Sequence, residues 1–281
     1  MANNQTATTG SQISANEIDT ETPHVARILD YLLDGTANYE SDRKLAHLAF
    51  ANWPGETGGV PGVRVDIRAA REALRRIVHV LAREHGIRQF IDFASGLPTM
   101  HNTHLAAREV TDDARVVYVD NDPRVVLHAH QLLADETDGR TVFLDADFRD
   151  PKDVLKRASE TLDLTQPVAF IMFGMLHFIE DEDHPEDIVK VLLDAVPSGS
   201  YLAFSHFAVA EGDDAMNQTL DAMDKQMGEA VVRRTRAEAA AFFDGMDVLD
   251  PGVVGTHEWR PPAGPAGPKP LPMWVGVARK R

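Results

Sequence analysis

Acidic residues follow three short apolar segments of the chain, at the positions where β-strands would end. The three sites are Asp92-Phe-Ala-Ser-Gly96, Asp120-Asn-Asp122 and Asp145-Ala-Asp147. In an open α/β sheet, ligands bind beyond the carboxyl ends of the strands, so we expect these side chains to converge on one site. Grouped carboxylates repel a phosphate. They suit a ligand that offers hydroxyl groups, amino groups or a positive charge.

The turn after the first apolar segment departs from the dinucleotide-binding fingerprint. That fingerprint, Gly-x-Gly-x-x-Gly, falls here on Ala94, Gly96 and Thr99, with Pro98 interrupting it. Gly96 still permits close approach of a ligand to the backbone. Asp120 suits hydrogen bonds from a ribose diol, and Asp147 suits the exocyclic amine of an adenine. The ligand with these groups and no required phosphate is an adenosine carrying a sulfonium, S-adenosylmethionine (SAM).

Many segments between residues 24 and 280 resemble a family of SAM-dependent methyltransferases that was first catalogued as a domain of unknown function. The matching segments are Ala26–Gly35, Asn38-Tyr39, Asp42-Arg43, Gly86–Asp92, Gly96–Thr99, Asn102, His104, Val116–Pro123, Asp145–Pro151, Leu176–Phe178 and Pro197–Leu202. Two segments depart from the family pattern. Ala94-Ser-Gly96 stands where Gly-Thr-Gly is usual, and Ala70-Arg-Glu-Ala73 stands where Asn-Arg-x-Phe is usual.

The resemblance implies roles for further residues around SAM and its product, S-adenosylhomocysteine. Asp92 would face the methionine amino group, and Phe148 would pack on the adenine ring. Ala94, Gly96 and Asn121 would line the cofactor site. The N-terminal helical segment would lie over its mouth through polar residues, namely Arg27, Tyr31, Asp30, Asn38, Tyr39 and Arg43.

Each of these roles has a simpler structural alternative. Asp120 and Asp147 could cap the helices that follow them. Asp92 could make an ordinary hydrogen bond at the end of a strand. The N-terminal polar residues could form ion pairs on a helix surface.

His177 is the candidate catalytic residue. Leu176-His177, followed by Asp181 and Glu182, resembles a stretch of plant-type small-molecule O-methyltransferases in which the histidine is the general base. A hydroxyl or protonated amine must lose a proton during methyl transfer, and histidine titrates near neutral pH. The alternative is that His177 only shapes the pocket. His101 and His104 could share a helical face, but no third ligand is evident, so we expect no metal.

The composition excludes several other functions. The 281 residues include 28 Lys and Arg against 44 Asp and Glu, a net charge of −16, and no cysteine. Such a charge disfavours nucleic acid and anionic membranes as partners. The most apolar stretch, 168–179, is too short to span a bilayer. The N-terminal residues show neither the basic start nor the apolar core of a secretory signal, so we expect none. We therefore expect a cytoplasmic monomer or homodimer that acts on a small-molecule methyl acceptor.

The elements that must position these residues follow from the sequence periodicity. Apolar segments at 88–93, 116–119, 141–144, 168–173, 201–204, 246–249 and 273–278 predict strands, separated mostly by helical segments. The expected fold is an α/β, class I, Rossmann-like doubly wound sheet of seven strands, the last antiparallel. We predict a disordered tail at 1–22, a helical cap at 23–86 and a SAM-binding domain at 87–281, with a Gly/Pro-rich loop at 51–62.

These observations predict SAM-dependent methyl transfer to an oxygen or nitrogen nucleophile of a small molecule. Two alternatives stay open at this point. One is a protein that binds SAM without transferring its methyl group. The other is a nicotinamide-dependent reductase, against which the incomplete glycine fingerprint argues.

Overall fold

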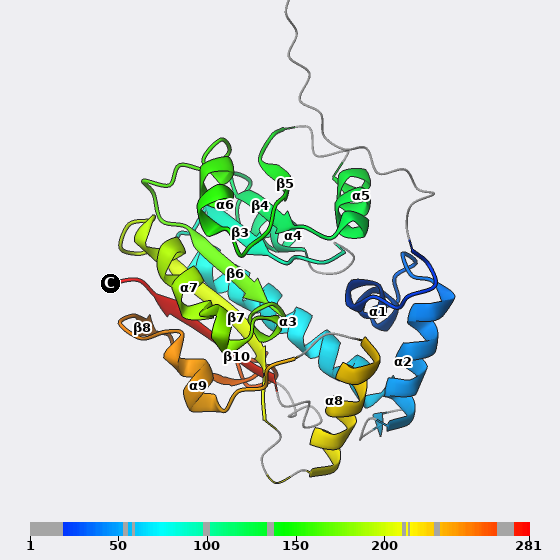
Figure 1. Ribbon diagram of the computed structural model, residues 1–281. Coiled ribbons are helices and arrows are strands. Elements are labelled where there is room, and N and C mark those ends of the chain that lie inside the picture. The colour runs from blue at the N-terminus through cyan, green and yellow to red at the C-terminus, as the bar shows by residue number, and fades with distance from the viewer. Residues whose placement is uncertain are drawn as a thin grey trace, which may run out of the picture.

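A mostly parallel β-sheet forms the centre of the molecule (Figure 1). The strands follow the order β5-β4-β3-β6-β7-β10-β8, and β9 pairs with β10. Neighbours from β5 to β7 are parallel, whereas β10 is antiparallel to β7, β8 and β9. The strands are β3 (Gln89–Phe93), β4 (Arg115–Asp120), β5 (Thr141–Asp145), β6 (Ala169–Phe173), β7 (Tyr201–Phe207), β8 (Asp247–Val248), β9 (Val254–Gly255) and β10 (Met273–Arg279).

The structure is a computed structural model that describes residues 19–52, 56–57, 60–97, 102–133, 138–209, 212, 214–227, 231–262 and 273–281. Most of the predicted tail, together with Pro98, Thr99 and His101, lies outside the described residues. The predicted α/β sheet with an antiparallel last strand is confirmed. The sequence missed β9, because two residues are too few to show a periodicity.

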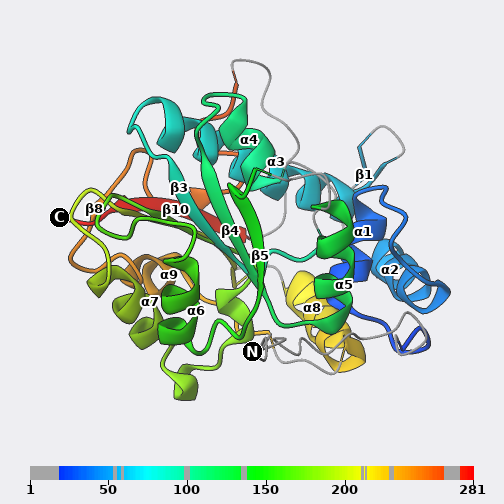
Figure 2. The same cartoon turned by 90° about the horizontal axis from the view of Figure 1, so that it is seen from above.

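Helices cover both faces of the sheet (Figure 2). One face packs against α3 (Gly62–Arg83) and α4 (Thr103–Arg108), the other against α6 (Pro151–Ala158), α7 (Pro185–Asp194) and α9 (Arg236–Ala241). Because both faces are covered, the central strands are apolar throughout rather than alternating. Helix α9 begins with the capping box that the sequence predicts, between Thr235 and Glu238.

Three helices lie together beyond the carboxyl ends of the parallel strands (Figure 1). They are α1 (Val25–Leu32), α2 (Glu40–Asn52) and α8 (Asp214–Met227), and α5 (Pro123–Leu132) lies next to α1 (Figure 2). Ile28, Leu45, Ile67 and Leu220 share one apolar cluster there. Helix α3 contacts both this cluster and the sheet, because Ile67 belongs to the cluster and the later residue Ile77 packs against the sheet.

A short antiparallel hairpin lies in the segment that we predicted to be a loop. It consists of β1 (Glu56–Thr57) and β2 (Val60–Pro61). The loop prediction was therefore wrong for these four positions. A two-residue glycine connection favours a hairpin, which a reading of glycine only as a strand breaker overlooks. Among the described residues, we find no helix with the length and apolarity needed to cross a membrane.

Candidate active site

A groove lies beyond the carboxyl ends of β3, β4 and β6, at the point where the strand order reverses around β3. Five residues singled out from the sequence line it together, namely Ala94, Gly96, Asp120, Asn121 and Phe148. They meet there because the carboxyl ends of neighbouring parallel strands reach the same edge of the sheet.

Asp120 joins the first two strand ends. Its Oδ2 accepts the backbone N–H of Gly96 at 3.1 Å, and its Oδ1 accepts the N–H of Asp122 at 3.0 Å. Burial raises the pKa of Asp120, although the two N–H donors oppose that shift. A carboxylate has about four acceptor positions, so each oxygen can still accept a hydrogen bond from a ligand. Local capping and ligand binding are thus compatible at this residue.

The turn after β3 forms despite its missing glycine. Ala94 has a φ of 46° and Gly96 a φ of 63°, both in the left-handed region. An alanine in that region costs about 1–2 kcal/mol. The departure at Ala94 therefore adds strain to the turn.

Asp92 is buried beneath the groove and does not line it. Its Oδ2 accepts a hydrogen bond from Thr103 Oγ1 at 2.7 Å. Burial raises the pKa of Asp92 to about 6, and the Thr103 hydroxyl and the Arg71 guanidinium oppose the shift. The observed contact is the strand-end hydrogen bond that the sequence left as an alternative.

Asp147 and Phe148 point in different directions. The Phe148 ring lines the groove, and the Arg149 guanidinium carbon lies 4.6 Å from its centroid. Asp147 is largely exposed and accepts the N–H of Arg149 at 2.9 Å. The cap of α6 is Asp150, which accepts the N–H of Asp153.

Arg27 and Tyr31 are not brought to the groove. Arg27 is buried, with its Nε 2.9 Å from the Asp42 carboxylate. The Tyr31 hydroxyl lies 3.2 Å from His47 Nε2. Helix α1 instead borders the groove through the residues at its start, His24, Val25, Ala26 and Leu29. Sequence reasoning missed these residues because most of them are apolar.

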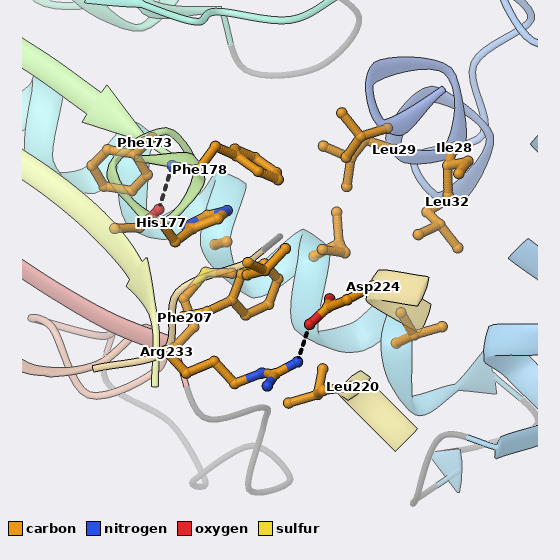
Figure 3. A pocket seen from close by; sticks show the side chains of 18 of the residues that line it. Ile28, Leu29, Leu32, Phe173, His177, Phe178, Phe207, Leu220, Asp224 and Arg233 are labelled. Atoms are coloured by element: carbon orange, nitrogen blue, oxygen red, sulfur yellow. Dashed lines mark hydrogen bonds and ion pairs between the residues drawn. The ribbon is translucent and has the colours of Figure 1, made fainter. Parts of the chain in front are cut away.

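A second, apolar cavity of about 140 Å³ adjoins the groove. Figure 3 shows Phe173, His177, Phe178 and Phe207 on one side of it, facing α1 across the space. Several residues line both cavities and form their common wall, namely Val25, Leu29, Arg71, Phe173, Gly174 and Phe178.

His177 follows β6 in a short 3₁₀ turn, Leu176–Phe178, and is buried in the wall of this cavity. Its Nδ1 has no hydrogen-bond partner among the described residues. Its ring centroid is 4.4 Å from that of Phe178 and 4.5 Å from that of Phe207. Burial holds the pKa of His177 well below its usual range, and His206 and Arg234 lower it further. The imidazole is therefore neutral at pH 7 and available as an acceptor.

His206 lies behind His177, with 5.7 Å between the ring centroids. Its Nε2 is 2.6 Å from the Arg234 guanidinium, and its Nδ1 is 2.7 Å from the carbonyl oxygen of Phe207. Arginine only donates, so Nε2 accepts and Nδ1 carries the proton. Asp181, which follows His177 in the sequence motif, pairs with Arg234.

Arg71 is the polar residue that sequence reasoning did not assign. It projects from α3 into the wall shared by the two cavities. Burial lowers the pKa of Arg71, and the charge of Asp92 opposes that shift. The available signal was the arginine of the Asn-Arg-x-Phe pattern, which the chain retains although the residues around it differ.

In the described parts of the chain, no group of three or more His, Asp or Glu side chains is arranged to hold a metal ion. His104 Nδ1 lies 2.8 Å from the Tyr118 hydroxyl.

Comparisons with known proteins agree with this geometry. The model of a family described as S-adenosyl methyltransferase matches residues 11–281. No curated protein matches the chain. A DUF574 family protein from Streptomyces avermitilis is 38% identical, with a TM-score of 0.85 over 94% of this chain and 99% of that one.

Two further solved structures are similar. A Thermobifida fusca protein proposed to be a methyltransferase is 37% identical, with a TM-score of 0.83 over 94% of this chain and 97% of that one. An O-methyltransferase family 2 protein from Planctomyces limnophilus, in complex with apigenin, is 14% identical. Its TM-score is 0.50 over 86% of this chain and 67% of that one, which shows a shared fold only.

Proposed function

The chain belongs to the S-adenosyl methyltransferase family and is a SAM-dependent methyltransferase, and from this premise we propose that it methylates an oxygen or nitrogen atom of a small molecule. One observation carries the proposal: the groove at the strand ends shares a wall with a small apolar cavity that contains His177. The excess of 44 acidic over 28 basic residues also favours a small molecule over a nucleic acid as acceptor.

The residues of the groove fit SAM. Asp120 would accept hydrogen bonds from the ribose hydroxyls, and Phe148 would pack on the adenine, with Asp147 near its amine. Ala94, Gly96 and Asn121 line the same groove. When bound, SAM supplies a methyl group on a positively charged sulfur, which is already a good leaving group.

Arg71 completes this set. The methionine part of SAM carries a carboxylate, and a guanidinium is the side chain best suited to pair with one. Arg71 lies at the junction of the two cavities, where the methionine part must reach the acceptor. The negative charge of Asp92 favours the protonated form of Arg71. In this proposal Asp92 acts by positioning Arg71, and the predicted contact with the amino group is secondary.

His177 would hold the acceptor and take its proton. Its neutral imidazole lines the apolar cavity and suits hydrogen bonding to a hydroxyl or amine. Leu29 and the neighbouring apolar residues of α1 would keep water from the junction. Exclusion of water strengthens each polar contact inside the site.

The test is turnover with a broad acceptor panel. Purified protein is incubated with SAM and neutral oxygen or nitrogen compounds, and S-adenosylhomocysteine and methylated product are measured by mass spectrometry. We expect both to accumulate in equal amounts with some of these compounds, and calorimetry to show binding of SAM but not NADPH. Methylation of added nucleic acid or protein, with none of the small molecules used, would contradict the proposal.

A further inference from the structure

The cavity beside His177 indicates the class of acceptor. We propose that it takes a single, uncharged aromatic ring and that a hydroxyl group on this ring receives the methyl group. This inference rests on the proposed function and narrows it to one substrate class. The size of the cavity, the chemistry of its walls, the His177 imidazole and the balanced charge of Arg233 support it.

The cavity has the size and lining of a site for one ring. Its volume is about 140 Å³, and an engineered apolar protein cavity of about 150 Å³ binds benzene. Phe173, Phe178 and Phe207 form one side, and aliphatic residues including Leu32 and Leu220 form the other (Figure 3). Aromatic rings favour offset or edge-to-face contacts with one another. A sugar or polyol would leave hydroxyl groups unpaired against these walls.

His177 selects a hydroxyl group on that ring. The His177 ring lines the cavity and points into it (Figure 3), and one nitrogen of the neutral imidazole accepts a hydrogen bond, so a ligand O–H can donate to it. The lowered pKa of His177 makes it a weak base. A weak base shares a proton more readily with a phenol, whose pKa is about 10 as in tyrosine, than with a much less acidic aliphatic alcohol.

The chemical step balances without any further reactant. The phenolic oxygen forms a bond to the methyl carbon while the carbon–sulfur bond breaks. The electron pair of the breaking bond stays on sulfur. The sulfonium loses its positive charge. The phenolic proton passes to the imidazole of His177 and then to water, so one positive charge leaves as a proton.

The positive charge of Arg233, in the cavity lining, is balanced by neighbouring carboxylates. Arg233 and Asp224 both line the cavity and pair with each other, and Arg233 also pairs, at 2.7 Å, with Asp221, which lies outside the lining. The Arg233 guanidinium therefore offers no uncompensated positive charge to a carboxylate on the ring, which favours an uncharged ligand.

The experiment compares four acceptors of related shape. They are catechol, 3,4-dihydroxybenzoate, cyclohexanol and aniline, each at equal concentration with SAM. We expect catechol to yield S-adenosylhomocysteine at least ten times faster than the others. Calorimetry in the presence of S-adenosylhomocysteine should show the same order of binding.

Variants of α8 test the cavity itself. Leu220→Trp fills it and should weaken catechol binding at least tenfold while the SAM Kd stays within twofold. Leu48→Trp, at a residue that is 50% exposed on α2, is the matched control and should change neither. Because Leu220→Trp can fail to fold, Leu220→Ala is a second variant, which should admit 2-naphthol as a new acceptor.

The outcomes separate this inference from the proposed function. Turnover of cyclohexanol or aniline above catechol would overturn the inference and leave the proposed function intact. The absence of turnover with every small molecule would contradict the proposed function. In that case, unchanged catechol binding in Leu220→Trp would overturn the assignment of the cavity as well.

Discussion

His24 Nε2 lies 2.5 Å from the Asp122 carboxylate, and this contact ties the start of α1 to the loop after β4. His24 also caps α1, because its Nδ1 accepts the backbone N–H of Ala26 at 3.3 Å. The proton is therefore on Nε2, facing Asp122. Both residues line the groove, so this contact helps to fix the position of α1 beside it.

His24→Ala is expected to raise the SAM Kd about five- to tenfold. The substitution removes both the helix cap and a partly buried charged contact, which are typically worth about 1 kcal/mol each. Calorimetry on His24→Ala, Asp122→Ala and the double variant measures the coupling between the two residues. Strictly additive losses would show that His24 and Asp122 act separately.

Asp120→Ala is expected to weaken SAM binding at least tenfold, and more than Asp147→Ala does. Asp120 is 9% exposed and faces the groove, whereas the Asp147 side chain is 44% exposed to solvent. Calorimetric titration of both variants gives the comparison. Equal losses would mean that Asp147 contributes as much to SAM binding as Asp120.

Ala94→Gly is expected to stabilise the fold by about 0.5–1 kcal/mol. Glycine relieves the left-handed alanine at φ 46°, worth about 1–2 kcal/mol, and part of that gain is lost to greater freedom of the unfolded chain. Urea denaturation measures the change. Ala106→Gly, inside α4, is the control and should destabilise by at least about 1 kcal/mol.

In Asp92→Asn, the free energy of unfolding is expected to fall less between pH 4.5 and pH 7.5 than it does in the original chain. The folded-state pKa of Asp92 is about 6 against an ordinary 3.8, so the native state holds its proton longer. Stability is therefore lost as the pH rises through about 4 to 6, by about 2 kcal/mol between the two test values. Urea denaturation of both proteins at each pH checks the sign. A variant with the same pH dependence as the original chain contradicts the raised pKa.

His177→Ala is expected to lower kcat about 10²-fold, the lower end of general base effects. Because burial holds the pKa of His177 well below 6.5, the original enzyme should show no histidine titration in kcat between pH 6 and 8. His184→Ala, at a largely exposed residue, is the control. A variant of His177 that retains most of its turnover would leave this residue a role only in shaping the cavity.

The sheet and half of the site could be predicted because they depend on short-range patterns. Strands such as β4 are buried on both faces and therefore apolar throughout, which the sequence displays directly. Asp120 and Gly96 come directly after strands, and parallel topology alone brings such positions together. The sequence left two alternatives for Asp92 and could not identify Thr103 as its partner, since this hydrogen bond joins two elements whose spacing depends on packing.

Orientation of the helices was decided only by the tertiary structure. Arg27 and Tyr31 lie four residues apart on one face of α1, and packing against α2 turns that face toward Asp42 and His47. The opposite residues, Val25 and Leu29, border the groove instead. Periodicity identifies a helix and its apolar stripe, but the direction of each face depends on contacts with distant elements. For the same reason Arg71 became part of the site only once α3 was in place.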